Sequence, residues 1–184
     1  MLRFVTTNPG KVREARTYLP ERIEQLEYDY AEIQSDDLAE IAARGAREAA
    51  EEAEEPVFVE DSGLFVDAIG GFPGPYSSFV YDTLGIERVA DLARAEGDQS
   101  AQFRSVIAYC DGETTETFEG VVVGRVVEPR GDGGFGYDPI FEHDGRTFAE
   151  MRIEEKNAVS HRGRALATFA DWLAGEPAGH EGVR

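Results

Sequence analysis

The sequence predicts an α/β fold, and three observations carry that prediction. Residues 57–59 and 64–66 are apolar and rich in β-branched and aromatic side chains, as in a central strand of a buried sheet. Residues 2–6 form a shorter run of the same kind and lead directly into a helix start. Residues 38–54 repeat apolar side chains at helical spacing, with acids on the opposite face. Strands and helices that alternate in this way predict a sheet covered by helices.

The length of 184 residues predicts one domain over residues 1–174, in one or two lobes, followed by a polar, flexible tail at 175–184. A hydrophobic content of 41% is typical of a globular protein. The single cysteine, Cys110, excludes a disulfide framework and a cysteine-based zinc site. We see no signal-peptide pattern and no apolar run near the ~20 residues of a membrane span, so we expect a cytoplasmic protein.

The formal net charge of −19 argues against general binding to nucleic acid or to an anionic membrane, since both need basic patches. The acids are spread along the chain, as in residues 48–55, which indicates a solvated surface. Adaptation to high salt, where screening reduces self-repulsion, explains this best. An acidic interaction surface is the alternative.

The basic residues are almost all arginine. Of 18 basic residues, 16 are arginines, and Lys11 and Lys156 are the two lysines. A lysine kept in such a chain indicates a site that needs a compact ammonium group. Two lysines kept by chance are the alternative.

The first helix start lies in the stretch TTNPGK at residues 6–11. Asn8 is a favourable N-cap, and Pro9 suits the first helical position. Lys11 then lies in the first turn, where free N–H groups and the helix dipole favour an anion. The stretch lacks the Gly-Lys-Ser/Thr of a P-loop, and an ordinary strand-to-helix turn fits it equally well.

Acidic residues interrupt the predicted central strand. Glu60, Asp61, Ser62 and Gly63 stand between its two apolar halves, and acids next to a buried strand are costly unless they are paired or hold a cation. Neighbours on a strand point to opposite faces, so Glu60 and Asp61 can share one metal only if the chain bends, which Gly63 would permit. The alternative is a strand that ends in an acidic turn.

The middle of the chain predicts further elements in order. A strand at 23–29 leads to Glu32, which by itself reads as a surface residue in a loop. Three glycines and two prolines at 70–75 predict a stiff turn that shapes a pocket, and residues 83–95 predict one or two short helices. Strands at 101–110 and 114–127 flank Asp-Gly, a strong hairpin signal, and this hairpin could close over a cleft.

The C-terminal third combines a glycine-rich loop with a basic helix start. The loop at 129–141 contains aromatic residues and Asp138, which could bind a ligand or cap a turn. A helix is predicted at 154–173, with Ser160 as a possible cap and with cations near its start. Cations oppose the dipole there, which is explained if an anion binds, although a helix with a basic first turn remains the alternative.

Together, these motifs resemble the inosine triphosphate pyrophosphatase family in their order and across nearly the whole chain. The matching stretches are TTNPGK at 6–11, AEIQ at 31–34, VEDSGL at 59–64, GGFPGPYSS at 70–78, GGFGYDPIF at 133–141 and EEKNAVSHRGRAL at 154–166. The resemblance implies an elongated two-lobed α/β fold with a long mixed sheet flanked by helices, an active-site cleft between the lobes, and a homodimer. The helix from residue 38 departs from the family in lacking its common asparagine and lysines.

The resemblance also implies roles for individual residues. Asp61 matches the proton acceptor, and the acids matched to Mg²⁺ are Glu32, Glu60 and Asp61. The positions matched to the nucleotide are Thr6, Thr7, Asn8, Pro9, Gly10, Lys11, Ser62, Phe135, Gly136, Tyr137, Asp138, Lys156, His161 and Arg162.

The expected reaction is Mg²⁺-dependent hydrolysis of non-standard purine nucleoside triphosphates (ITP, dITP or XTP) to the monophosphate and pyrophosphate. Mg²⁺ prefers oxygen ligands, often one or two carboxylates plus substrate phosphates. A nucleotide sensor without hydrolysis and a metal-dependent phosphatase of small substrates are the alternatives.

Overall fold

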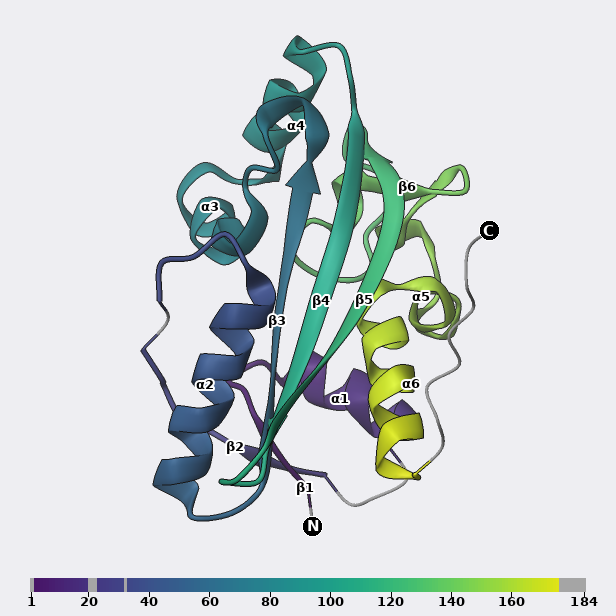
Figure 1. Ribbon diagram of the computed structural model, residues 1–184. Coiled ribbons are helices and arrows are strands. Elements are labelled where there is room, and N and C mark those ends of the chain that lie inside the picture. Colours follow the sequence, from purple (N-terminus) through teal and green to yellow (C-terminus); the bar gives the residue numbers. More distant parts are fainter. Residues whose placement is uncertain (1, 20–22, 32, 176–184) are drawn as a thin grey trace, which may run out of the picture.

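The computed structural model describes residues 2–19, 23–31 and 33–175 and arranges them around one open mixed β-sheet of seven strands (Figure 1). The strand order is β2-β1-β3-β4-β5-β6-β7; β2, β1 and β3 run parallel, and the remaining pairs are antiparallel. The strands are β1 (Leu2–Val5), β2 (Ile23–Leu26), β3 (Val57–Val66), β4 (Ser100–Cys110), β5 (Thr115–Val126), β6 (Phe141–His143) and β7 (Arg146–Thr147).

Three long strands, β3, β4 and β5, form the backbone of the molecule. The β3–β4 register runs without interruption from the pair Val57↔Cys110 to the pair Val66↔Ala101. By contrast, β1 pairs with β3 only through Arg3↔Val57 and Phe4↔Phe58. Because β1 ends so early, the edge of β3 after residue 58 is open to other segments of the chain.

Six α-helices and four short 3₁₀ helices complete the described structure. They are α1 (Pro9–Tyr18), α2 (Leu38–Ala53), η1 (Asp67–Ile69), η2 (Gly74–Tyr76), α3 (Ser77–Leu84), α4 (Ile86–Ala95), η3 (Asp138–Ile140), η4 (Phe148–Glu150), α5 (Ile153–Val159) and α6 (His161–Leu173).

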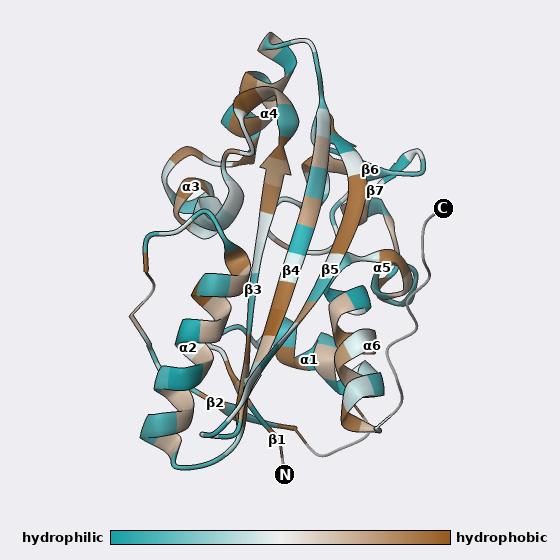
Figure 2. Cartoon of the chain, viewed as in Figure 1, coloured by the Kyte–Doolittle hydropathy of each residue, from teal (hydrophilic) through white to brown (hydrophobic). Residues whose placement is uncertain are grey.

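The helices cover both faces of the sheet. The alanine stripe of α2 packs on Val57 and Val59, which point to one face, and in Figure 2 teal bands alternate with pale ones along α2. Helices α1 and α6 pack on the opposite face, around Phe58 and Phe169. Buried apolar side chains on both faces explain why β3 reads as a nearly continuous hydrophobic run.

A third cluster holds the other end of the sheet together. Leu64 and Val66 of β3, Phe103 of β4, Phe141 of β6 and Val89 of α4 are all buried there. The upper ends of the long strands thus have their own core, with α3 and α4 on one side and β6 on the other (Figure 1).

The α/β class, the mixed sheet and the hairpin between β4 and β5 are confirmed. The hairpin does not form a separate lobe over a cleft, because β4 pairs with β3 along the whole length of β3 in the central sheet. Three boundaries were wrong. The first short helix starts at Ser77, not at 83, because the chain passes directly from η2 into α3. The predicted helix at 154–173 is two helices, since Ser160 is extended (φ −70°, ψ 157°) and caps α6. Strand β2 ends at Leu26, and the predicted tail lies beyond residue 175, outside the described residues.

None of the helices in the described part of the chain has the length and apolar character needed to cross a membrane.

Candidate active site

A cleft of about 560 Å³ opens where β1 and β3 separate. Its volume is in the range of ligand-binding pockets. The wall is built from the β1–α1 turn, the middle of β3, the start of α3, the loop before η3, and helices α5 and α6. Segments far apart in the sequence therefore meet at the open edge of β3.

The β1–α1 turn forms the helix start that the sequence predicted. Asn8 Oδ1 accepts hydrogen bonds from Gly10 N (2.8 Å) and Lys11 N (3.4 Å), and Thr6 Oγ1 accepts one from Asn8 N (3.1 Å). Pro9 is the first residue of α1. Thr6, Thr7, Asn8 and Lys11 line the cleft, whereas Pro9 and Gly10 build the turn behind them.

Glu60 is buried among cations. Its Oε2 lies 2.7 Å from Lys11 Nζ and its Oε1 lies 3.2 Å from Arg162 Nε, while Ser105 Oγ donates to Oε1 at 2.5 Å. Burial alone would raise the pKa of Glu60, but Arg162, Lys11 and the hydroxyl of Ser105 lower it well below its ordinary range. Glu60 is therefore an ionised carboxylate whose two oxygens both have partners.

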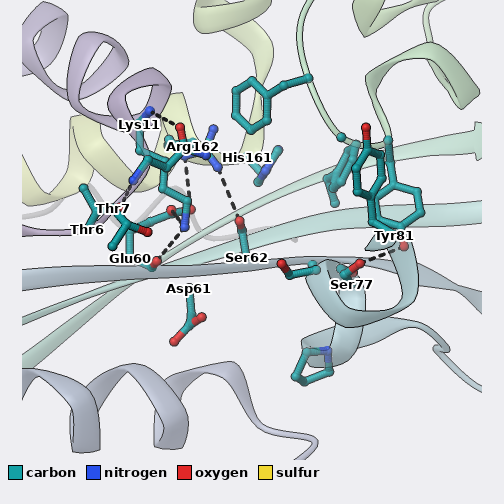
Figure 3. A pocket seen from close by; sticks show the side chains of 18 of the residues that line it. Thr6, Thr7, Lys11, Glu60, Asp61, Ser62, Ser77, Tyr81, His161 and Arg162 are labelled. Atoms are coloured by element: carbon teal, nitrogen blue, oxygen red, sulfur yellow. Dashed lines mark hydrogen bonds and ion pairs between the residues drawn. The ribbon is translucent and has the colours of Figure 1, made fainter. Parts of the chain in front are cut away.

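Asp61 points to the other side of the sheet, away from Glu60 and Ser62 (Figure 3). The bend that would let Glu60 and Asp61 share one metal is absent, because β3 stays paired with β4 through both residues. Gly63 serves a different purpose from the one expected. A Cβ there would lie 2.2 Å from Gly74 O, so glycine permits the close approach of η2. Asp61 still lines the cleft, from the α2 side.

Lys156 and Asp138 form a second ion pair. Lys156 Nζ lies 2.6 Å from Asp138 Oδ2 and 4.6 Å from the ring centroid of Phe135. Phe135 N donates to the same Asp138 oxygen (2.8 Å). Burial raises the pKa of Asp138 although Lys156 opposes the shift. A Cβ on Gly134 would lie 2.0 Å from this carboxylate, which explains one glycine of the loop.

Arg162 connects the two ion pairs. Beyond Glu60, its Nη1 lies 2.7 Å from Glu14 Oε2 and its Nη2 donates to Ser62 Oγ at 3.3 Å. Glu14 also lies 3.6 Å from Lys156 Nζ. Glu14 was not among the site residues expected from the sequence motifs. A local signal existed, since this acid stands between the apolar residues Val12 and Ala15 on the buried face of α1.

His161, Gly136 and Tyr137 also line the cleft, as their motif positions suggested. The ring of His161 stacks on Phe103, with centroids 4.5 Å apart, and burial lowers its pKa, with Arg162 adding to the effect. Tyr137 donates its hydroxyl to Ser77 O (2.8 Å), which ties the 129–141 loop to α3.

The donor set for a metal ion is small. Within residues 2–19, 23–31 and 33–175, no group of three His, Cys, Asp or Glu side chains is placed to hold a metal ion. Mg²⁺ in nucleotide sites commonly uses one or two carboxylates, with phosphates and water as the other ligands. Asp61 fits that pattern, whereas Glu60 forms ion pairs with Lys11 and Arg162. Glu32 lies outside the described residues.

Fold and site define a class: a mixed-sheet α/β protein with a cation-lined cleft at the point where two parallel strands separate. The chain belongs to the Ham1 family, whose model matches residues 2–172. It is 54% identical over 178 residues to the dITP/XTP pyrophosphatase of Thermococcus kodakarensis, covering 94% of this chain and 96% of that protein. It is 50% identical over 183 residues to the enzyme of the same name from Methanopyrus kandleri, covering 96% and 97%.

Solved structures agree with this assignment. A HAM1 protein from Coxiella burnetii superimposes with a TM-score of 0.85 at 33% identity, covering 95% of this chain and 98% of that one. A nucleoside-triphosphatase, also titled dITP/XTP pyrophosphatase, from Mycobacterium abscessus gives a TM-score of 0.71 at 33% identity, covering 91% and 97%. The family resemblance read from the sequence motifs is confirmed.

Proposed function

We propose that this chain is a nucleoside triphosphate pyrophosphatase that hydrolyses non-standard purine nucleotides (ITP, dITP or XTP) to the monophosphate and pyrophosphate. One observation carries the proposal: Lys11, Lys156 and Arg162 converge on a single cleft beside a capped helix N-terminus, in a protein of net charge −19. Such a concentration of cations inside an acidic protein suits a polyanion. The names of the relatives support the same reaction.

The phosphate end of the substrate would lie at the β1–α1 turn. The positive end of the α1 dipole favours an anion at this turn, where Asn8 Oδ1 already accepts from the N–H groups of Gly10 and Lys11. Lys11 and Arg162 lie beside it on the Glu60 side of β3, and Arg162 Nη2 donates to Ser62 Oγ, which also lines the cleft. These groups would stabilise the charge that develops on the leaving pyrophosphate.

The base end would lie against the 129–141 loop. Phe135 offers a ring face beside Lys156, and Asp138 and His161 supply hydrogen-bonding groups. Donors directed at a 6-oxo group would face the amino group of adenine, and unpaired buried donors are costly. Rejection of ATP would follow from that mismatch.

Asp61 would be the general base. Its carboxylate would accept a proton from the water that attacks the α-phosphorus, while the phosphate-binding groups hold the nucleotide in line. Mg²⁺, when bound at Asp61 with the substrate, would supply charge neutralisation and a more acidic water. Glu60 is the weaker candidate for a metal ligand because both of its oxygens are engaged. A homodimer in the cytoplasm completes the proposal.

A product assay tests the function. Purified protein is incubated with Mg²⁺ and either ITP, XTP, ATP or GTP, and pyrophosphate is resolved from orthophosphate. We expect pyrophosphate from ITP and XTP at rates orders of magnitude above those with ATP and GTP. Orthophosphate as the product would favour the phosphatase, and tight binding without turnover would favour the sensor. Equal rates on all four nucleotides would leave the hydrolase but remove the selection for non-standard bases.

A further inference from the structure

Glu14 is a buried acid that does not line the cleft. It lies on α1 with 4% of its surface exposed, behind the cations that do line the cleft. One carboxylate oxygen, Oε2, lies 2.7 Å from Arg162 Nη1, and the other, Oε1, lies 3.6 Å from Lys156 Nζ. Each oxygen of one side chain is thus directed at a different cation.

These two cations share the ring of Phe135, which lies 4.6 Å from Lys156 Nζ and 5.4 Å from the Arg162 guanidinium, but their ionic and hydrogen-bonding partners differ. Lys156, from α5, contacts Asp138 and the ring of Phe135 in the 129–141 loop. Arg162, from α6, contacts Glu60 and Ser62 on β3. Glu14 therefore joins the loop proposed to hold the base to the strand proposed to hold the phosphates.

The charges around Glu14 balance. Three carboxylates (Glu14, Glu60 and Asp138) face three cations (Lys11, Lys156 and Arg162). Arg162 and Lys156 are only 3% and 4% exposed, and buried cations need compensating anions to stay charged and fixed. Without Glu14, these two cations would share the remaining acids and lose their fixed separation.

We propose that Glu14 is a positioning residue that couples the base end to the phosphate end of the cleft by holding Lys156 and Arg162 at a set distance from each other. The proposal rests on the proposed function. It assigns Glu14 no contact with the nucleotide or with a metal. Its effect on the reaction passes through the two cations.

The primary test is Glu14→Gln, which keeps the side-chain shape and removes the charge. We expect kcat/KM for ITP to fall by about ten- to a hundredfold, the effect of disturbing one or two charge-assisted hydrogen bonds. Inorganic tripolyphosphate, a probe of the phosphate end alone, should also bind more weakly, with a higher Kd. Glu116→Gln, which removes one exposed acid from β5, is the matched control and should match the parent in both assays.

A double-mutant cycle separates positioning from general damage. If Glu14 acts through Arg162, then the fold-loss of kcat/KM caused by Glu14→Gln should be several-fold smaller in an Arg162→Gln background than in the parent chain. Should Glu14→Gln unfold the protein, Glu14→Asp keeps the charge but draws it back by one methylene. We expect Glu14→Asp to fold and to lose part of kcat/KM, with an intermediate Kd for tripolyphosphate.

Three results would overturn the proposal. One is a folded Glu14→Gln or Glu14→Asp that equals Glu116→Gln in kcat/KM and in Kd. Another is a double variant whose loss of kcat/KM equals the product of the two single losses, which would mean that Glu14 and Arg162 act independently. The third is tighter binding of tripolyphosphate by Glu14→Gln, which would mean that Glu14 only competes with phosphate for the cations. The proposed function fails separately, when the parent chain releases no pyrophosphate from ITP.

Discussion

Two adjacent acids of β3, Glu60 and Asp61, lie in different environments although they differ by one position in the chain. Glu60 faces α1 and α6, where Lys11 and Arg162 bind its carboxylate. Asp61 points to the opposite face of β3, the side covered by α2 (Figure 3). Strand alternation, and not residue type, creates the difference.

One strand can thus divide the tasks of a phosphate site between its two faces. The Glu60 side gathers cations and pairs them in advance, so it suits binding of a polyanion and stabilisation of a leaving group. The Asp61 side offers a carboxylate to the same cleft from the opposite face, so it suits proton transfer and a metal ion. Because β1 ends before it reaches Glu60 and Asp61, this part of β3 lies at the open edge, with one acid on each face of the strand.

The largest expected effect on turnover comes from the Asp61 side of β3. Asp61→Asn should lower turnover of ITP by about 10²–10⁴-fold, the range for loss of a general base, while nucleotide binding stays measurable. Steady-state kinetics and calorimetric titration with a non-hydrolysable analogue provide the two readouts. Asp67→Asn, an exposed acid just after β3, serves as the control. Turnover of Asp61→Asn within tenfold of the parent would remove Asp61 from the role of base.

A smaller effect is expected on the cation side. Lys11→Arg and Lys156→Arg keep the charge, yet each should lower kcat by about ten- to a hundredfold, since a guanidinium is longer and planar. Lys156 should be the more sensitive of the two, because Asp138, Glu14 and Phe135 enclose its ammonium group.

Arg13→Lys is the matched control for these lysine variants, since Arg13 is exposed on the same helix as Lys11. Its kinetics should equal those of the parent chain. If the lysine variants also equal the parent, then the use of lysine at only two of 18 basic positions was a misleading guide to the site.

Much of the site followed from local sequence because local chemistry builds it. Asn8 and Pro9 predicted the start of α1, and that start needs no distant partner. The Asp-Gly pair predicted the hairpin for the same reason. Glu14 could not be placed in this way, since its partner Arg162 lies 148 positions further along the chain.

The wrong predictions for Gly63 and for the helix at 154–173 also come from contacts between distant parts of the chain. Gly63 was expected to bend the strand, but its small size matters because Gly74 from a later segment packs on it. The helical spacing over 154–173 concealed a break at Ser160, whose extended backbone lets α5 and α6 turn Lys156 and Arg162 toward one cleft. Tertiary contacts that no local pattern encodes decide such positions.

The stability of the folded chain should depend on pH through the buried groups on the Glu60 side of β3. His161, on the Glu60 side, has a folded-state pKa lowered below 6.5 by burial and by Arg162, so below pH 6.5 the unfolded chain binds more protons and stability falls. Glu60 adds a second loss of stability only below pH 4.5, its ordinary pKa, because its folded-state pKa is lowered. Asp138, whose pKa is raised, partly opposes that second loss.

Urea unfolding at pH 7 and pH 5.5 measures the contribution of His161. The parent chain should lose about 1 kcal/mol more than His161→Phe over this interval, given 1.36 kcal/mol per unit of pKa shift. The phenyl ring can keep the stacking on Phe103 without a proton to bind. Equal losses in both proteins would mean that His161 becomes protonated in the folded state.

The smallest expected effect comes from salt, which acts on exposed charges and hardly on buried pairs. Helix α2, on the Asp61 side, carries the exposed acids Glu51 and Glu52, whereas Glu60 is buried with its cations. With a net charge of −19, the midpoint of thermal unfolding should rise with KCl as repulsion is screened. Neutralising Glu51 and Glu52 to Gln should make that rise shallower.

Glu60→Gln makes the salt experiment decisive. Because its ion pairs are shielded from solvent, this variant should lower the midpoint at every KCl concentration while leaving the slope against salt unchanged. A parent midpoint that stays flat or falls would show that the acidic surface serves a purpose other than salt adaptation. A changed slope in Glu60→Gln would mean that water and ions reach the cation side, and that the two faces of β3 differ less than their contacts indicate.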